Sequence, residues 1–207
     1  RWWSSAASDV YKRQSKEFKE RYLSNPKHLN VFNGKAVVFE GPEDYHKRLN
    51  SKKLKIDENS ILIVRGCGPV GYPGSAEVVN MQPPDRLLKK GISHLPTLGD
   101  GRQSGTSESP SILHVSPESA VGGDLGIVKT GDKMTIDLNK RRVDLLISKS
   151  EFKKRRKNKK LFKANNQTPW QEIFRNTVGQ LEDGACINSR GRYLDVSHTK
   201  GLPRDSH

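Results

Sequence analysis

A twelve-residue stretch, residues 99–110, concentrates the side chains that could do chemistry. It holds three glycines, four hydroxyl side chains, Arg102, Asp100 and Glu108, and it contains no large apolar side chain. Glycines let a backbone turn sharply and approach a ligand closely, while hydroxyls and a guanidinium can bind carboxylate or hydroxyl oxygens. A solvated surface loop would have a similar composition, so composition alone leaves both interpretations open.

Three residues are considered for a site: two lie in this stretch, and Glu77 lies just past the earlier glycine-rich loop at 66–74. Ser104 could act as a nucleophile or base, but only if a cation or a helix N-terminus stabilises its alkoxide. Glu77 could bind a hard cation through oxygen, although a carboxylate at a helix start is the favoured interpretation from sequence. Asp100 is predicted to be a turn residue rather than a ligand. Ser109 and Pro110 predict the cap and first turn of a helical segment at 110–113.

The histidines and cysteines do not form a metal site on spacing alone. His94, His114, His198 and His207 lack metal-ligand spacing, and the two cysteines, Cys67 and Cys186, lack a Cys-x-x-Cys pair. His94 and His114 are therefore predicted to be structural. Two cysteines and the absence of a secretory signal favour a reduced, intracellular setting, which we assign to the cytoplasm.

The elements that must position these residues are mostly β. Apolar runs predict strands, and proline, glycine and capping signals predict short helices between them. The expected fold class is therefore mostly β with short helices (α+β). Predicted strands cover residues 34–40, 60–65, 94–98, 125–129, 134–138 and 143–148, and predicted helices begin at residues 44, 84, 116 and 168. The last helix is expected to use Thr168 as N-cap and to present Ile173, Phe174, Val178 and Leu181 as an apolar face.

Two glycine-rich loops, 66–74 and 99–108, each follow a β-rich run. Loops that leave neighbouring strands at the same end of a sheet or barrel commonly face one another. The sequence therefore predicts that these two loops share one site.

The net charge of +14 is concentrated in one segment, 149–163, with nine Lys or Arg against the single acid Glu151. A solvated, partly helical segment is favoured over a nucleic-acid site, because only Phe152 and Phe162 accompany the charges. The chain also lacks an apolar run of the roughly 20 residues that span a bilayer. We expect no membrane partner, and a nucleic-acid partner is disfavoured.

The chain is expected to divide into five parts. Residues 1–14 resemble translated sequencing-adapter sequence and would not be native, and residues 15–33 would form a linker. A β-barrel-like domain would cover 34–148, a basic connecting segment 149–167, and a helix with a polar tail 168–207. The protein would then continue upstream of this fragment.

Three motifs in order resemble the carboxy-terminal domain of the dihydroxy-acid and sugar-acid dehydratases. They lie at 65–81, 98–113 and 115–123, and the resemblance extends from about residue 34 to His207. Residues 103–107, Gln-Ser-Gly-Thr-Ser, and the helix opening at Thr168 are more similar to the aldonic sugar-acid branch than to the branched-chain amino-acid branch.

The resemblance implies a swivelling domain that closes over a larger amino-terminal domain, which would carry an iron–sulfur cluster and most Mg²⁺ ligands. It implies that Ser104 is the alkoxide base that removes the C2 proton and that Thr106 and His207 bind the substrate. Glu77 would reach the Mg²⁺. The substrate would be a 2,3-dihydroxy sugar acid, the product a 2-keto-3-deoxy acid, and the enzyme a homo-oligomer.

Two positions depart from the family pattern. Glu108 stands where the family usually has glycine, and Cys67 replaces a small or acidic residue and is not expected to bind a cluster. Two alternatives remain at this stage. One is a branched-chain dihydroxy-acid dehydratase, and the other is a nucleic-acid-binding module that uses residues 149–163.

Overall fold

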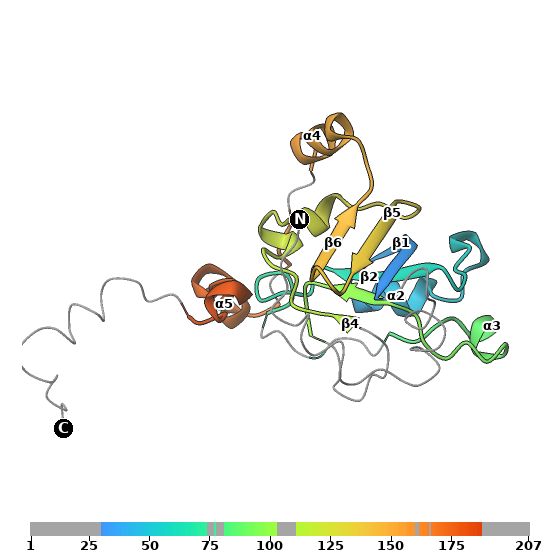
Figure 1. Cartoon of the computed structure of the whole chain (residues 1–207). Helices are drawn as coiled ribbons and strands as arrows, with labels where there is room; N and C mark the ends of the chain where they lie inside the picture. Colours follow the sequence, from blue (N-terminus) through green and yellow to red (C-terminus); the bar gives the residue numbers. More distant parts are fainter. Residues whose placement is uncertain are drawn as a thin grey trace, which may run out of the picture.

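The computed structural model describes residues 30–73, 77, 81–102, 111–159, 162–165 and 167–187. Its centre is a curled, mixed six-stranded sheet with the strand order β4-β3-β2-β1-β5-β6 (Figure 1). The strands are β1 (Val31–Glu40), β2 (Ser60–Arg65), β3 (Thr97–Gly99), β4 (Ser111–Ile112), β5 (Lys133–Asp137) and β6 (Arg142–Leu145). From β1 to β4 neighbouring strands are parallel, whereas β5 pairs antiparallel with both β1 and β6.

Apolar side chains leave β1 and β2 alternately toward two hydrophobic clusters. Ala36 and Val38 belong to one cluster with Ile61 and Ile63, together with Leu98 and Met134. Val37 and Phe39 belong to the second cluster with Leu62 and Val64, which also contains Tyr45 and Leu95. Because successive strand residues face opposite sides of a sheet, the unbroken apolar sequence of β2 is buried on both faces, as predicted from its composition.

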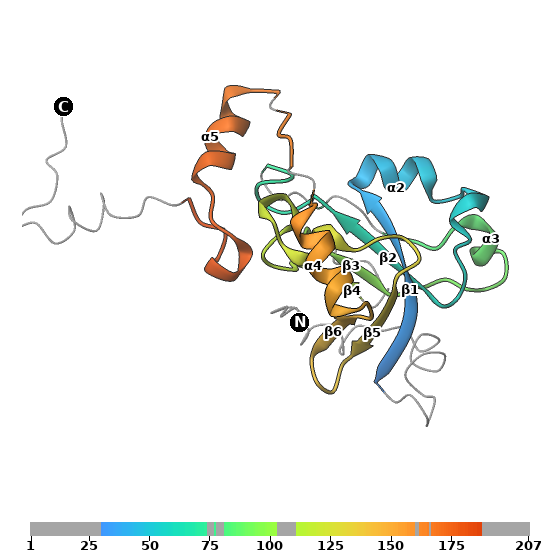
Figure 2. The same ribbon diagram turned by 90° about the horizontal axis from the view of Figure 1, so that it is seen from above.

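Short helices surround the sheet. They are α2 (Pro42–Arg48), α3 (Asp85–Leu88), α4 (Lys149–Lys157) and α5 (Pro169–Thr177), with 3₁₀ turns η3 (Lys52–Leu54), η4 (Ser119–Val121), η5 (Asp124–Ile127) and η6 (Leu181–Asp183). In both views α5 lies on one side of the sheet, away from α2 and α3 on the other (Figures 1 and 2). None of the helices in the described part of the chain is long and apolar enough to cross a membrane.

The structure confirms the predicted fold class and several elements, including the strands at 34–40 and 60–65 and the helix that begins after Thr168. The Thr168 side chain accepts a hydrogen bond from the Gln171 amide, as expected of an N-cap. The strand β3 is shorter and later than the predicted 94–98. The strand β1 starts at Val31, three residues before the predicted strand.

Two predicted elements are wrong. Residues 125–129 are not a strand; residues 124–127 form η5, because Leu125 and Ile127 are buried while the carbonyls of Leu125 and Val128 accept hydrogen bonds from Arg65. The predicted helical segment at 110–113 contains the strand β4 instead. Ser111 and Ile112 pair with Thr97 and Leu98 of β3, and this pairing outweighs the local Ser-Pro signal.

The basic segment is only partly the solvated segment that its composition predicts. It forms α4, and Lys153, Lys154 and Lys157 are exposed on it. The Arg155 side chain, however, is only 11% exposed and forms ion pairs with Asp132 and Glu151. The helix is therefore attached to the rest of the domain through Arg155, which the sequence predicted to be solvent-exposed.

Candidate functional site

The two glycine-rich loops begin side by side at one edge of the sheet. The strands β2 and β3 are parallel neighbours in which Val64 pairs with Gly99, so both chains leave the sheet at the same end. Gly101 lies so close to the first loop that a Cβ atom there would be 2.5 Å from the Cys67 carbonyl oxygen. The described parts of the loops thus support the prediction that they share a site, and glycine is required where they touch.

The Asp100 carboxylate connects three segments. It is fully buried and accepts hydrogen bonds from the Gly66 amide at 3.0 Å and the Cys67 amide at 2.9 Å. It also accepts bonds from the amide of Ser119 at 2.9 Å and from the Ser119 hydroxyl at 2.5 Å. Asp100 is therefore not the simple turn residue that the sequence suggested. It is a buried acceptor that fixes the first loop, the second loop and η4 relative to one another.

A second buried carboxylate, Glu118, holds the middle of the first loop. Its oxygens accept hydrogen bonds from the Val70 and Gly71 amides, both at 2.8 Å. Burial raises the pKa of Glu118, against the opposing effect of the bonds from Val70, Gln180 and Gly71. A Cβ atom at Gly68 would lie 2.5 Å from the Glu118 carboxylate, so only glycine fits beneath it.

The segment around α5 is joined to this loop by polar contacts. Arg175 of α5 donates from Nε to the Val70 carbonyl at 2.9 Å. The Gln180 side chain donates to the Glu118 carboxylate at 2.9 Å and accepts from the Glu118 amide at 3.0 Å. Of the predicted apolar face of α5, Ile173 is 51% exposed, whereas Phe174, Val178 and Leu181 are partly buried.

The predicted metal ligand Glu77 lies beside Arg102. A parallel bridge joins the two residues, and the Arg102 guanidinium is 3.4 Å from Glu77 Oε1. Both side chains are about half exposed, so this pair contributes little to stability. Glu77 therefore offers one accessible carboxylate to a hard cation such as Mg²⁺. The described residues contain no group of three His, Cys, Asp or Glu that could complete a metal site.

The two cysteines do not fit an iron–sulfur cluster. Cys67 is buried, and burial, followed by the nearby Asp100 carboxylate, raises the pKa of its thiol far above the ordinary value. A cluster ligand must be a thiolate, which this environment disfavours. Cys186 is exposed and donates from its thiol to the Gly184 carbonyl.

The backbone of His114 and Val115, which follow the second loop, is hydrogen-bonded to the start of that loop. The His114 amide donates to the Gly101 carbonyl at 3.3 Å, and the next amide, Val115, donates to the Gly99 carbonyl at 3.1 Å. Burial, and then the charge of Arg102, lower the pKa of His114. These two backbone bonds hold the chain after the second loop against the start of that loop, and the structural role of the His114 side chain stays a prediction.

Of the predicted site residues, Ser104, Thr106 and His207 lie outside the described residues, as does Glu108. The structure adds Asp100 and Glu118, which sequence analysis missed as parts of the site. An acid placed between two glycines at a strand end could have indicated Asp100. Glu118 follows Pro117 in a polar turn and carries no comparable signal.

Comparisons with known proteins identify relatives of this domain. Residues 21–185 match the family described as dihydroxy-acid/6-phosphogluconate dehydratase C-terminal. A D-xylonate dehydratase from Caulobacter vibrioides is 53% identical over 191 residues, which are 92% of this chain and 32% of that protein. An L-arabinonate dehydratase from Rhizobium leguminosarum is 49% identical over 62% of this chain and 22% of its own length.

A more distant relative is a dihydroxy-acid dehydratase from Thermodesulfovibrio yellowstonii. It is 38% identical over 75% of this chain and 28% of its own length. The chain thus spans about a third or less of the length of these curated relatives.

The Asp100 contacts generate a first prediction. In Asp100→Asn one carboxylate oxygen becomes an NH₂ group that faces backbone N–H donors, so buried hydrogen bonds are lost without replacement. We expect the free energy of unfolding to fall by about 2–4 kcal/mol, measured by urea denaturation. The control Asp57→Asn changes an exposed carboxylate in a turn and should cost less than about 1 kcal/mol. An equal loss of unfolding free energy in the two variants would contradict the role of Asp100 in fixing the two loops and η4.

Proposed function

The chain belongs to the dihydroxy-acid/6-phosphogluconate dehydratase family through its C-terminal domain, and on that premise we propose that it is part of a sugar-acid dehydratase. The enzyme would remove water from a 2,3-dihydroxy sugar acid to give a 2-keto-3-deoxy acid. The observation that carries this proposal is the 53% identity to a D-xylonate dehydratase over 92% of the chain. An L-arabinonate dehydratase supports the same substrate class.

In the proposed reaction Ser104, as its alkoxide, takes the proton from C2 of the substrate. Departure of the C3 hydroxyl then leaves an enol, which tautomerises to the 2-keto acid. Thr106 and His207 are proposed to hold the substrate. These three roles rest on the family resemblance. The described structure supports a fixed starting point for the second loop, because the Asp100 carboxylate is held by hydrogen bonds four residues before Ser104.

Glu77 is proposed, on the family resemblance, to bind Mg²⁺, and its accessible carboxylate and long bond to Arg102 are compatible with that role. When bound, Mg²⁺ would neutralise the substrate carboxylate and favour the serine alkoxide. Arg102 would then be released from Glu77 and could contact an anionic substrate. An iron–sulfur cluster does not fit Cys67 and Cys186, so its ligands are proposed to lie in an amino-terminal domain of a longer polypeptide.

The branched-chain substrate class is the main alternative. The dihydroxy-acid dehydratase from Thermodesulfovibrio yellowstonii is 38% identical, compared with 53% for the D-xylonate dehydratase. A nucleic-acid function receives less support, because Arg155 in the basic segment is used in internal ion pairs. We further propose, on the family resemblance alone, that the complete enzyme is a homo-oligomer.

The role of Ser104 is tested in the complete enzyme with D-xylonate, L-arabinonate and a branched-chain 2,3-dihydroxy acid as substrates. Loss of a general base typically costs 10²–10⁴-fold in rate, so we expect Ser104→Ala to lower turnover by about that factor. Exchange of the substrate C2 hydrogen with deuterated water should fall in parallel. The control Ser107→Ala, in the same loop, should lose no more than about tenfold. C2 exchange at the parent rate in Ser104→Ala would exclude Ser104 as the base.

The metal role of Glu77 gives a separate prediction. Glu77→Gln keeps the shape of the side chain but removes the charge that attracts a cation, so a higher Mg²⁺ concentration should be needed for half-maximal activity. We expect a shift of about tenfold or more for the loss of one charged ligand. Glu172→Gln, an exposed carboxylate on α5, serves as the matched control. An unchanged Mg²⁺ titration in Glu77→Gln would leave Glu77 as the partner of Arg102 alone.

A further inference from the structure

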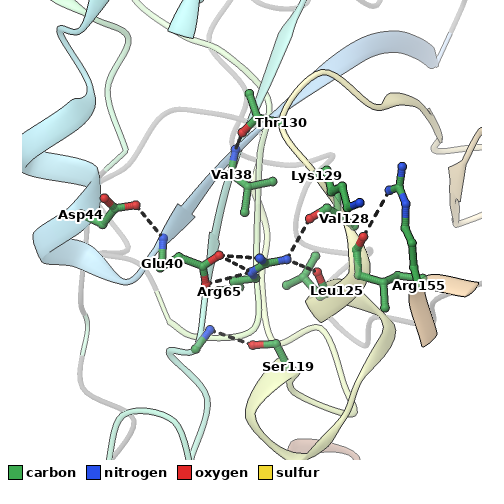
Figure 3. Close-up of polar contacts among 12 residues, drawn as sticks. Val38, Glu40, Asp44, Arg65, Ser119, Leu125, Val128, Lys129, Thr130 and Arg155 are labelled. Atoms are coloured by element: carbon green, nitrogen blue, oxygen red, sulfur yellow. Dashed lines mark hydrogen bonds and ion pairs between the residues drawn. The ribbon is translucent and has the colours of Figure 1, made fainter. Parts of the chain in front are cut away.

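A groove with a volume of about 910 Å³ lies beyond the ends of β1 and β2, on the side of α4. Figure 3 shows polar contacts around Arg65, one of its lining residues, which lies between Glu40 and the backbone carbonyls of Leu125 and Val128. Cationic side chains outnumber carboxylates in its lining by six to three. The cations are Arg65, Lys129, Lys154, Arg155, Lys159 and Lys163, and the carboxylates are Glu40, Glu43 and Glu151.

Arg65 forms structural contacts within the protein at one side of the groove. Its Nε lies 3.0 Å from both Glu40 carboxylate oxygens, and its Nη1 donates to the carbonyls of Leu125 at 3.1 Å and Val128 at 2.9 Å. These bonds neutralise Glu40 and fix η5 beside the end of β2. Arg65 and Glu40 therefore shape the groove and add little net charge to it.

Arg155 likewise forms structural contacts, which hold α4 along the side of the groove. It donates to both Asp132 oxygens, to Glu151 at 2.7 Å and to the Ile127 carbonyl at 3.2 Å. With the Arg155 side chain only 11% exposed, these contacts hold α4 in a defined position against η5. The neighbouring residue Lys154 is exposed on the same helix.

The remaining lysines supply the charge of the groove. Within the described residues, no ion pair is formed by the side chains of Lys129, Lys154 or Lys163. Lys159 donates to the Gly123 carbonyl at 2.6 Å, which is a neutral partner. Burial lowers the pKa of Lys159, and an anion beside it would relieve this destabilisation of the charged form. The four lysines that line the groove therefore face a single lining carboxylate, Glu43, that forms no ion pair in the described structure.

From this arrangement we propose that the groove binds a compact anion of metabolite size with two or more negative charges, either a phosphate compound or a di- or tricarboxylate. Its volume lies within the range of small-molecule sites, roughly 300–1,000 Å³. The concave shape and the internal pairing of Arg155 argue for a small anion over an extended nucleic acid. The proposal does not depend on the proposed dehydration, because none of the residues assigned to that reaction lines the groove.

The test is isothermal titration calorimetry of the 207-residue chain with pyrophosphate and with citrate, at low and at physiological salt. We expect one saturable site per chain and a loss of affinity of at least about tenfold in the double variant Lys154→Gln/Lys163→Gln. The control Lys52→Gln/Lys53→Gln removes the same charge from η3, outside the groove, and should bind as the parent does. Circular dichroism of both variants checks that the fold is retained.

The two probes also separate the sources of the anion. Binding of pyrophosphate alone assigns the groove to phosphate compounds, and binding of citrate alone assigns it to polycarboxylates. An equal loss of affinity in Lys154→Gln/Lys163→Gln and in the control Lys52→Gln/Lys53→Gln would overturn the proposal, because it would show attraction to the net charge of the protein only. Lack of saturable binding would overturn it as well. A single-stranded oligonucleotide that displaces pyrophosphate and depends on Lys154 and Lys163 would replace it with nucleic-acid binding.

Discussion

The buried carboxylate of Asp100 is the interaction on which the geometry of the candidate site depends. Burial of a charge is costly unless hydrogen bonds compensate it, and here three amides and a hydroxyl supply that compensation. Each donor comes from a segment that would otherwise be a free loop or turn. The same carboxylate thus fixes the start of both glycine-rich loops and of η4. Gly66 supplies a positive φ of 76°, and Gly101 allows the close approach to Cys67.

The surroundings of the site follow the same principle. Glu118 binds two amides of the first loop and connects them through Gln180 to the segment that follows α5. Arg65 and Arg155 bind the carbonyls of η5 and of Val128 after it, and so attach α4 to the end of the sheet. Irregular backbone has polar groups that no neighbouring strand can satisfy. Buried charged side chains satisfy them here in the described part of this glycine-rich edge.

Sequence analysis predicted the parts of this arrangement that local patterns determine. The apolar runs of β1 and β2 and the cap of α5 follow from residue patterns and from signals a few residues apart. The adjacency of the two loops follows from the rule that loops leaving neighbouring strands at one end of a sheet face one another. The long-range bonds were missed, because Asp100 and Glu118 resemble ordinary turn acids when the partner segments are unknown. Residues 125–129 were misread for the same reason: their apolar side chains fit a strand, but Arg65, sixty residues away, binds the carbonyls that a strand would pair.

The most direct test of this account is hydrogen–deuterium exchange at the amides that the two carboxylates bind. If Asp100 and Glu118 hold the first loop, the Gly66, Cys67, Val70 and Gly71 amides should exchange as slowly as those of β2, since a bonded amide must open before it exchanges. The exposed residues of η3 supply the fast reference within the same chain. Loop amides that exchange at the rate of η3 would contradict the central claim that buried carboxylates make this edge rigid.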